Sequence, residues 1–381
     1  MLADHALPAM LDYQALIREA RLAPSPAIRP CVDALRRRAS PTFVMGRNPH
    51  ARALMGVLAV DGVVDDFEAQ ATHWNGSPII RSDAIPGGAS VINCAMSISP
   101  NSARKRIEAR GDLTHLSYID ICRAEPSLLP LPDFVEEARS AFEHEPDTYC
   151  EVFSRLKDPE SRSVFNQVMA YRLTGDMSHM AGFSVRLRDQ YFEPFLGPLR
   201  DSVFVDCGGY DGDTTEEFIR RYPGYAKVYL FEPSRANMAR ARSRLAAWQD
   251  TIEFLPLGLS DRPGELSFDA DQGSASAVSG SGSETIPVST LDKEISTRTS
   301  FIKMDLEGWE LQALHGAERH IRNDGAILAI AVYHTIADFW RIPAYILSLN
   351  AGYDILLRHY TEGWSETVMY FVPRGATTEP H

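Results

Sequence analysis

Apolar runs that stop abruptly at a polar residue or a glycine recur along the second half of the chain. Each has the length of a buried strand, and stretches long enough for a helix separate them. With their terminal turn residues included, the five runs cover residues 203–207, 227–233, 254–259, 301–308 and 329–334. This alternation predicts an α/β fold in which parallel strands share one sheet. Their carboxyl ends then meet at one edge, which is where open sheets of this kind bind ligands.

The pattern changes after the fifth run. Residues 353–360 and 366–372 alternate between apolar and polar side chains around a Thr-Glu-Gly turn, which predicts an antiparallel pair. Between the third and fourth runs, residues 271–283 are rich in serine and glycine and are interpreted as a loop. A surface excursion is favoured over a lid that orders around a ligand. The predicted sheet is therefore mostly parallel, with an antiparallel closing strand.

The first half of the chain divides into three parts. Residues 1–40 predict a helical arm, because apolar residues recur there at loosely helical spacing before a proline-rich stretch. Residues 41–125 predict a smaller Rossmann-like α/β domain, with strands near 42–45, 62–66, 76–80 and 89–94. The pattern of residues 126–200 predicts a helical connector. Its apolar stripes either pack in the core or cap a pocket. In the second case, acceptor contacts would come from Tyr171, Arg172, His179 or Arg186.

The first turn of the larger sheet, residues 206–214, combines glycines with acidic side chains. The glycines let the backbone approach a ligand closely, whereas the aspartates repel a phosphate group. A cationic ligand therefore fits this turn better than a phosphate. The residues predicted to contact the ligand here are Asp206, Gly208, Gly209, Tyr210, Asp211 and Thr214.

A second acidic position follows the next strand. Glu232, with Pro233 after it, stands where a carboxylate receives ribose hydroxyls in sheets of this type. A cationic group and a ribose together point to S-adenosylmethionine as the cofactor. The adenine would lie against Leu257 and Gly258, and Asp305 would contact the methionine part of the donor or position the acceptor.

Four segments together resemble one known family: DCGGYDGD at 206–213, FEP at 231–233, IKMDLEG at 302–308 and VYH at 332–334. They are similar to the FkbM-type family of S-adenosylmethionine-dependent methyltransferases over residues 180–373, and IKMDLEG is the most specific of the four. The first turn departs from the family in having Gly-Gly-Tyr where Gly-Ala-Asn is frequent. The resemblance implies a Rossmann-like methyltransferase domain, placed at residues 201–373. It also implies methyl transfer to an oxygen, commonly on a sugar or polyketide.

The N-terminal α/β unit more weakly resembles Rossmann-type domains of sugar-modifying enzymes. It lacks the G-x-G-x-x-G turn that holds a pyrophosphate, so a structural or substrate-presenting role is favoured over a dinucleotide site. Two alternatives to an O-methyltransferase stay open. One is an NAD-linked oxidoreductase, suggested by Glu232 and the two α/β units, and the other is a non-catalytic binding protein with a methyltransferase fold.

Methyl transfer to an alcohol needs a group that takes the hydroxyl proton. Candidates near the ligand edge are Asp305, Glu307, His334 and His359. His334 is favoured as the general base, because imidazole titrates near neutrality and this residue directly follows a buried strand. Asp305 and Glu307 flank a single residue, so an extended strand end would point both to the same side. Together with His334 they would suit a divalent cation, an arrangement ranked below metal-free catalysis.

Composition narrows the class of partner. The chain has 381 residues and a formal net charge of −13, which argues against nucleic acid as a partner. The family resemblance implies a small-molecule or glycan acceptor instead. Its five cysteines form no C-x-x-C pair, which predicts a reducing compartment, the cytoplasm, and no structural zinc site. No apolar run reaches the roughly 18 residues of a membrane span, so no membrane partner is expected. A homo-oligomer is compatible with the sequence.

Overall fold

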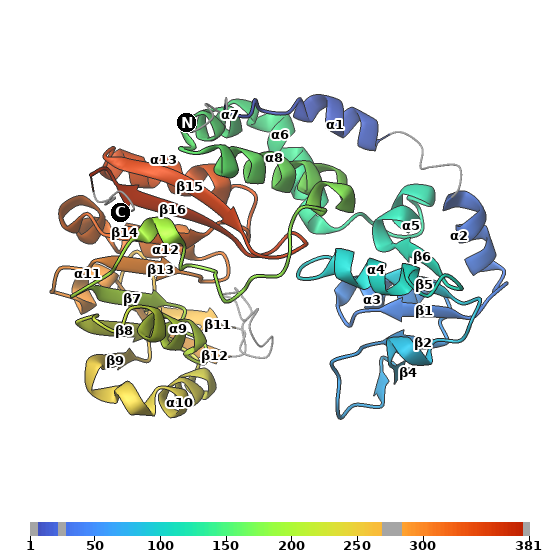
Figure 1. The fold of residues 1–381 in the computed structure, drawn as a ribbon, viewed down its shortest axis with the longest axis horizontal. Helices are drawn as coiled ribbons and strands as arrows, with labels where there is room; N and C mark the ends of the chain where they lie inside the picture. The colour runs from blue at the N-terminus through green and yellow to red at the C-terminus, as the bar shows by residue number, and fades with distance from the viewer. Residues whose placement is uncertain (1–6, 22–27, 269–283, 376–381) are drawn as a thin grey trace, which may run out of the picture.

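The computed structural model describes residues 7–21, 28–268 and 284–375, which form two lobes (Figure 1). Each lobe is built around its own sheet. Helices from the middle of the chain lie above the larger, C-terminal lobe and lead from it to the smaller, N-terminal lobe.

A seven-stranded sheet forms the centre of the C-terminal lobe, in the order β15-β16-β14-β13-β7-β8-β9. Its strands are β7 (Val203–Cys207), β8 (Lys227–Phe231), β9 (Ile252–Leu255), β13 (Phe301–Met304), β14 (Ile327–Ala331), β15 (Tyr353–His359) and β16 (Thr367–Pro373). Neighbours from β9 to β14 pair in parallel, whereas β16 runs antiparallel to both β14 and β15. The predicted α/β fold with an antiparallel closing ribbon is therefore confirmed.

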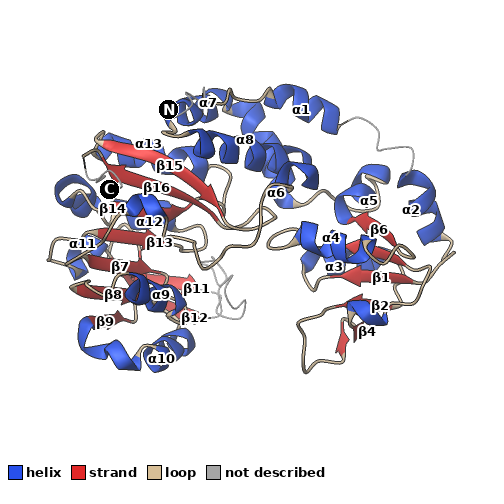
Figure 2. Ribbon diagram, viewed as in Figure 1, coloured by secondary structure: helices blue, strands red, loops and turns tan. Residues whose placement is uncertain are grey.

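The apolar runs form strands because the sheet is covered on both faces, which suits continuous rather than alternating hydrophobicity (Figure 2). β13 and β14, for example, are buried along their whole length. The helices of this lobe are α9 (Asp213–Arg221), α10 (Arg235–Arg244), α11 (Leu291–Glu294), α12 (Glu310–His315) and α13 (Asp338–Leu349). The strand order reverses between β7 and β13, so the connections after these two strands diverge and leave a crevice at their carboxyl ends.

The third predicted strand, residues 254–259, is corrected by the structure. The chain leaves the large sheet at Leu255, and Gly258–Leu259 (β10) instead joins a small sheet in the order β10-β12-β11. Its other strands are β11 (Gly264–Phe268) and β12 (Glu284–Ser289). Pro256 separates the two pieces, since proline has no backbone N–H for a strand ladder. The predicted loop at 271–283 lies outside the described residues.

The N-terminal lobe has a six-stranded sheet in the order β3-β4-β2-β1-β5-β6. Its strands are β1 (Thr42–Met45), β2 (Gly62–Val64), β3 (His73–Trp74), β4 (Ser77–Ile80), β5 (Ser90–Asn93) and β6 (Thr114–Ser117). Its helices are α2 (Ile28–Arg36), α3 (Pro49–Val57), α4 (Pro100–Glu108) and α5 (Tyr118–Ala124). Asn48 caps α3 by accepting a hydrogen bond from the Ala51 N–H, and Pro49 follows as the first helical residue.

The connecting helices are α6 (Asp133–His144), α7 (Pro146–Arg155) and α8 (Pro159–Thr174). α8 packs on β15, where the Ser161 hydroxyl accepts a hydrogen bond from the Leu357 N–H at 2.8 Å.

The predicted arm, residues 1–40, divides between the lobes: α1 (Tyr13–Ala20) packs on α8, whereas α2 packs on α5. Tyr13 fixes α1 by donating to Asn166 at 2.8 Å. The other short helical segments are the 3₁₀-helices η1 (Ser82–Ala84), η2 (Met177–Met180), η3 (Pro194–Leu196) and η4 (Ala246–Thr251), and the π-helical segment η6 (His320–Asp324).

The two lobes meet backbone against backbone. The loop after β5 runs beside the turn between β15 and β16, where Glu362 N donates to Ile98 O at 2.8 Å and Trp364 N donates to Met96 O at 3.2 Å. A Cβ added at Gly363 would lie 2.1 Å from the Met96 carbonyl oxygen, so only glycine allows this approach. The Glu362 carboxylate closes the contact by accepting from Ser102 N and Oγ.

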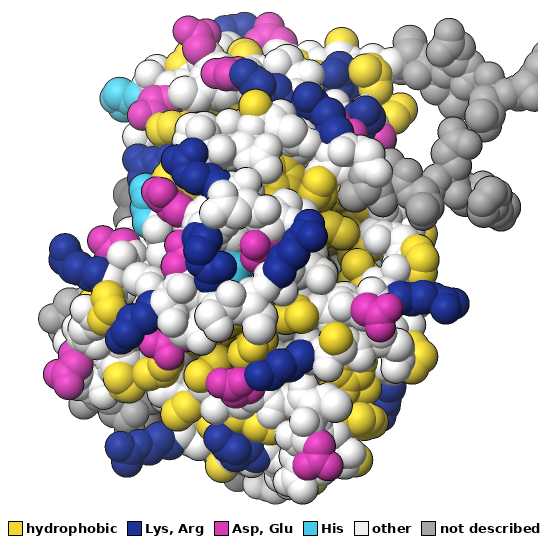
Figure 3. Space-filling view, turned by 90° about the vertical axis from the view of Figure 1, so that its left-hand side faces the viewer, with side chains coloured by type: hydrophobic (Ala, Val, Ile, Leu, Met, Phe, Trp, Pro, Cys, Tyr) yellow, Lys and Arg dark blue, Asp and Glu magenta, His cyan; other side chains and the backbone are white. Residues whose placement is uncertain are grey.

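The surface carries charges of both signs. On the end of the C-terminal lobe that faces the viewer in Figure 3, basic and acidic side chains are interspersed without forming a patch of one sign. Surface ion pairs include Lys227 with Glu253 at 2.6 Å, and such exposed pairs contribute little to stability. Within the described ranges, no helix combines the length and apolar character that crossing a membrane requires.

Candidate active site

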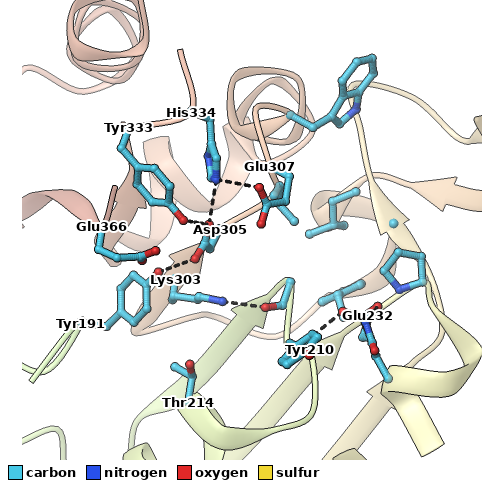
Figure 4. A pocket seen from close by; sticks show the side chains of 18 of the residues that line it. Tyr191, Tyr210, Thr214, Glu232, Lys303, Asp305, Glu307, Tyr333, His334 and Glu366 are labelled. Carbon is cyan, nitrogen blue, oxygen red and sulfur yellow. Dashed lines mark hydrogen bonds and ion pairs between the residues drawn. The ribbon is translucent and has the colours of Figure 1, made fainter. Parts of the chain in front are cut away.

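A cavity of about 470 Å³ opens at the carboxyl edge of the large sheet, at the crevice between β7 and β13 (Figure 4). Most of the residues predicted for the site line it: Gly208, Tyr210, Thr214, Glu232, Pro233, Leu257, Gly258, Asp305, Glu307 and His334. Residues far apart in the sequence thus converge, because the parallel strands deliver their terminal turns to the same edge.

Three predicted contacts do not line the cavity. Asp206 is fully buried beneath it and accepts a hydrogen bond from Thr215 Oγ1 at 2.7 Å. Gly209 packs against Leu230, whose side chain occupies the place of a Cβ. Asp211 turns outward to form an ion pair with Arg244 at 2.7 Å. These three residues shape the turn, and the prediction that they contact the ligand is corrected.

Hydrogen bonds hold the first turn in place. The N–H groups of Gly208 and Gly209 both donate to the Phe231 carbonyl, at 3.0 and 2.9 Å. Gly208 has φ +81°, and a Cβ there would lie 2.0 Å from the Asp305 carbonyl oxygen. A residue with a side chain would therefore push β7 and β13 apart at the point where the cavity begins.

Glu232 is positioned by its neighbours before any ligand arrives. Its carboxylate accepts from Tyr210 N at 3.0 Å and from Ser234 N at 2.8 Å, and burial raises its pKa. The side chain is only 5% exposed, yet it lines the cavity. Such a held carboxylate loses little conformational freedom on accepting further hydroxyl groups.

Lys303 is a site residue to which the sequence analysis assigned no role. It lies on β13 with a side chain 3% exposed, and its Nζ stands 3.1 Å from Asp206 Oδ1. Nζ also donates to the Gly208 carbonyl at 2.7 Å. Burial alone would lower the pKa of Lys303, but Asp206 and Asp305 outweigh it and raise the pKa above its ordinary value. A lysine within an apolar strand was the available signal, because a buried charge needs a partner.

Asp305, Glu307 and His334 do come together. One ligand atom from each lies within 4.8 Å of the others, with His334 Nε2 at 3.5 Å from Asp305 Oδ1 and 3.2 Å from Glu307 Oε2. The predicted geometry was wrong, however. β13 ends at Met304, and Glu307 reaches the cluster through a left-handed turn with φ +53° rather than along an extended strand.

The surroundings of His334 change the basis for its predicted role. Burial would lower its pKa, but Glu310 and Glu307 outweigh this effect and hold the pKa well above the ordinary value. A raised pKa means that the ring holds its own proton more tightly, which makes it a poorer acceptor for another proton. The prediction assumed an ordinary histidine pKa, and the nearby carboxylates shift that pKa upward. The catalytic role of His334 stays a prediction.

The remaining predicted candidates lie elsewhere. His359 is 1% exposed within the core and bonds to Thr367 Oγ1 at 2.8 Å, so it is not a base for this cavity. Tyr171 and Arg172 are also buried in the core, and Arg172 donates to main-chain carbonyls instead. Arg186 lies over the Tyr360 ring, and neither it nor His179 lines the cavity.

The wall opposite the first turn was not anticipated. It is formed by Ser97, Ile98, Gln190, Tyr191, Tyr333, Trp364, Ser365 and Glu366. Tyr191 donates from its hydroxyl to Asp305 Oδ2 at 2.7 Å, and Gln190 Nε2 donates to Glu366 Oε2 at 2.7 Å. These residues belong to loops from four separate regions, and only Tyr333 falls within a segment that the sequence marked as part of the site.

This arrangement can be compared with known proteins. The family model for the methyltransferase FkbM domain matches residues 206–355. This segment is an FkbM methyltransferase domain. A crystal structure of methyltransferase FkbM from Methylobacillus flagellatus KT is 24% identical, with a TM-score of 0.73, and the match covers 94% of this chain and 98% of that chain. At this identity the likeness shows the fold alone, and it includes both lobes.

Other solved structures are much less similar. A putative rRNA-methylase from Clostridium thermocellum is 10% identical with a TM-score of 0.33, over 48% of this chain and 93% of that chain. An rRNA methylase from Streptococcus thermophilus is 17% identical with a TM-score of 0.33, over 47% of this chain and 90% of that chain. Neither similarity is high enough to indicate the function of this chain. No curated protein matches it.

The FkbM domain contains the first turn, Glu232 and the acidic cluster, whereas most of the opposite wall lies outside it. Ser97 and Ile98 come from the N-terminal lobe, and Gln190 and Tyr191 precede the matched segment. The family and the fold support a methyltransferase. The cavity thus has one side within the FkbM domain and another built by the rest of the chain.

Proposed function

We propose that the protein is an S-adenosylmethionine-dependent O-methyltransferase that acts on a hydroxyl of a sugar-containing or other hydroxylated small metabolite. The observation that carries the proposal is the Glu232 carboxylate, which faces a cavity also lined by the carboxylates of Asp213, Asp305, Glu307 and Glu366. A carboxylate there suits the ribose hydroxyls, and the acidic surroundings suit the sulfonium of the donor. The same surroundings disfavour the pyrophosphate of NAD.

The opposite wall supports an acceptor rich in hydroxyl groups. Tyr191, Tyr333 and Gln190 offer both donors and acceptors, and the carboxylates of Asp305 and Glu366 accept only. Hydroxyls can satisfy both kinds of group. A phosphate at this position would instead face the like charges of the carboxylates.

In the proposed reaction the acceptor oxygen attacks the methyl carbon, the carbon–sulfur bond breaks, and the sulfonium becomes a neutral thioether. The hydroxyl proton has to leave for a base, and positioning contributes much of the rate. Burial, together with the charge of Asp305, raises the pKa of Glu366 to about 7, which suits a proton acceptor at neutral pH. Glu366 is therefore added to the predicted candidates for this step.

Changing Glu232 to alanine should weaken binding of S-adenosylmethionine by about 1–3 kcal/mol, the scale of hydrogen bonds lost to a charged group. Isothermal titration calorimetry would measure the dissociation constant for the parent and for Glu232→Ala. The matched control is Glu253→Ala, because Glu253 lies on the neighbouring strand β9 with its side chain 46% exposed. Equal donor affinity in a folded Glu232→Ala variant would contradict the assigned donor site.

Changing His334 to glutamine should lower turnover by roughly 100-fold or more, the contribution of a positioned catalytic group. Donor affinity should stay close to the parental value, because His334 lies across the cavity from Glu232 (Figure 4). Turnover would be followed by transfer of labelled methyl to candidate acceptors between pH 6 and 9, roughly the range that spans histidine titration. Parental rates throughout would remove His334 from the reaction and leave Asp305 and Glu366 as candidates.

A further inference from the structure

In the cluster of Asp305, Glu307 and His334, the two distances from the imidazole to the carboxylates have the spacing of a metal centre, and all three ligand atoms lie within 4.8 Å of one another. Two atoms bound to one cation at about 2.0–2.2 Å are about 3.0–3.6 Å apart in octahedral or tetrahedral geometry. His334 Nε2 lies 3.5 Å from Asp305 Oδ1 and 3.2 Å from Glu307 Oε2. In the part of the chain that the structure describes, this is the one such group of three side chains.

The orientation of His334 also fits a metal ligand. Its Nδ1 lies 3.0 Å from Glu310 Oε1, a carboxylate with no exposure that is itself fixed by the Leu306 N–H at 2.7 Å. Metal-bound histidines usually turn their second nitrogen toward a carboxylate in this way. The His334 side chain is 8% exposed, and neither ring nitrogen makes a well-aligned hydrogen bond despite the nearby carboxylates. Nε2 is therefore a buried polar atom directed at the cluster without an aligned partner.

Asp305 is oriented by a second set of contacts. Tyr191 donates to its Oδ2 at 2.7 Å, and Oδ1 lies on the side of His334, where the Tyr333 hydroxyl also donates to it at 3.5 Å. Tyr191 is in turn fixed by Gln190 Nε2 at its hydroxyl and by the Tyr370 hydroxyl at its main-chain N–H. Both Asp305 and His334 thus have supporting partners on the side away from the cluster, as ligands of a metal centre do.

The charge of the cavity favours a cation at this place. Its carboxylates are Asp213, Glu232, Asp305, Glu307 and Glu366. Lys303 is the lysine among the lining residues, and its Nζ is already engaged by Asp206 and the Gly208 carbonyl. A divalent ion among Asp305, Glu307 and His334 would offset this excess of negative charge.

We propose that Asp305, Glu307 and His334 bind one divalent transition-metal cation, of the Mn²⁺ or Zn²⁺ class, at the acceptor side of the cavity. Two carboxylates and one imidazole suit these ions better than Mg²⁺ or Ca²⁺, which prefer oxygen ligands alone. The metal's role rests on the proposed function: it would bind the acceptor hydroxyl and make its proton easier to remove. The sequence favoured metal-free catalysis over a cation held by these three residues. The geometry of the site favours the cation instead.

Equilibrium dialysis of the chelator-treated full chain against MnCl₂ would test the site, with ZnCl₂ as a second probe and bound metal measured by elemental analysis. We expect binding near one ion per chain for the parent. Asp305→Asn and Glu307→Gln should each weaken it at least 10-fold, and Glu310→Gln about 10- to 100-fold, as loss of an outer partner does. Asp83→Asn is the matched control, since Asp83 lies in the N-terminal lobe with its side chain 80% exposed.

Failure of this proposal is separable from failure of the proposed function. Calorimetry with S-adenosylmethionine on the same samples reports the donor site alone, and melting temperatures confirm that each variant is folded. Donor binding without any saturable uptake of Mn²⁺ or Zn²⁺ would overturn the metal site and leave the donor site standing. Equal metal affinity in the parent, Asp305→Asn and Glu307→Gln would also overturn it. Metal uptake without donor binding would support the centre and reject the methyltransferase function.

Discussion

Replacing Lys303 with methionine should lower the free energy of unfolding by about 3–5 kcal/mol at neutral pH, the cost of removing one partner from a buried ion pair. Asp206 is fully buried and has Lys303 Nζ at 3.1 Å, so the substitution leaves a carboxylate without a compensating charge. It also removes the hydrogen bond to the Gly208 carbonyl. Urea denaturation would measure the change, and S-adenosylmethionine affinity should fall as well because the first turn loses this support.

The matched control is Lys227→Met, which removes the exposed pair with Glu253 on the same sheet. That change should cost at most about 1 kcal/mol, as for surface ion pairs in general. The loss in Lys303→Met should shrink as the pH falls, because a protonated Asp206 no longer needs a cation. A loss as small as that of the control would show that Asp206 is solvated or neutral in the parent.

Acid should destabilise the protein through His359. Burial, with Arg172 nearby, lowers the pKa of this histidine to about 3. The unfolded chain binds the proton at an ordinary histidine pKa while the folded chain does not, so stability falls as the pH drops from roughly 6.5 toward 3. The contribution amounts to about 2 kcal/mol between pH 7 and 5 and about 3 kcal/mol by pH 4.

His359→Asn should remove this part of the pH dependence, because asparagine keeps a polar group near Thr367 but does not titrate. The measurement is the free energy of unfolding from urea denaturation at pH 7, 5 and 4 for parent and variant. His73→Asn, at an exposed position on β3, should keep the parental pH profile. Parallel profiles for the parent and His359→Asn would contradict the buried, neutral state of this residue.

The strands of the large sheet were predictable because their apolar runs and terminal turns are local features. The gathering of Gly208, Glu232 and Asp305 around one cavity followed from them, since parallel strands bring their ends to one edge whatever the details of packing. The error at residues 254–259 has an equally local cause. Pro256 interrupts the run, and a proline within a predicted central strand argues against its continuation.

The opposite wall could not be predicted in the same way. Tyr191 and Glu366 come from loops separated by most of the C-terminal lobe in sequence, and only the folded chain brings them to Asp305 and Gln190. The shift in the pKa of His334 was missed for a related reason. Its pKa depends on Glu310, which α12 places behind the ring. The rule that parallel strands bring their ends to one edge does not predict where that helix lies.

The close approach of the lobes at Gly363 constrains how such a protein can diverge. Main-chain groups of residues 96–98 and 362–364 bond to each other directly, and Ser97, Ile98 and Trp364 also line the cavity. An insertion or a bulkier residue on one side displaces the backbone of the other, because no side chain lies between them to absorb the change. A change in one loop is therefore expected to require a matching change in the other, so this end of the cavity depends on both lobes at once.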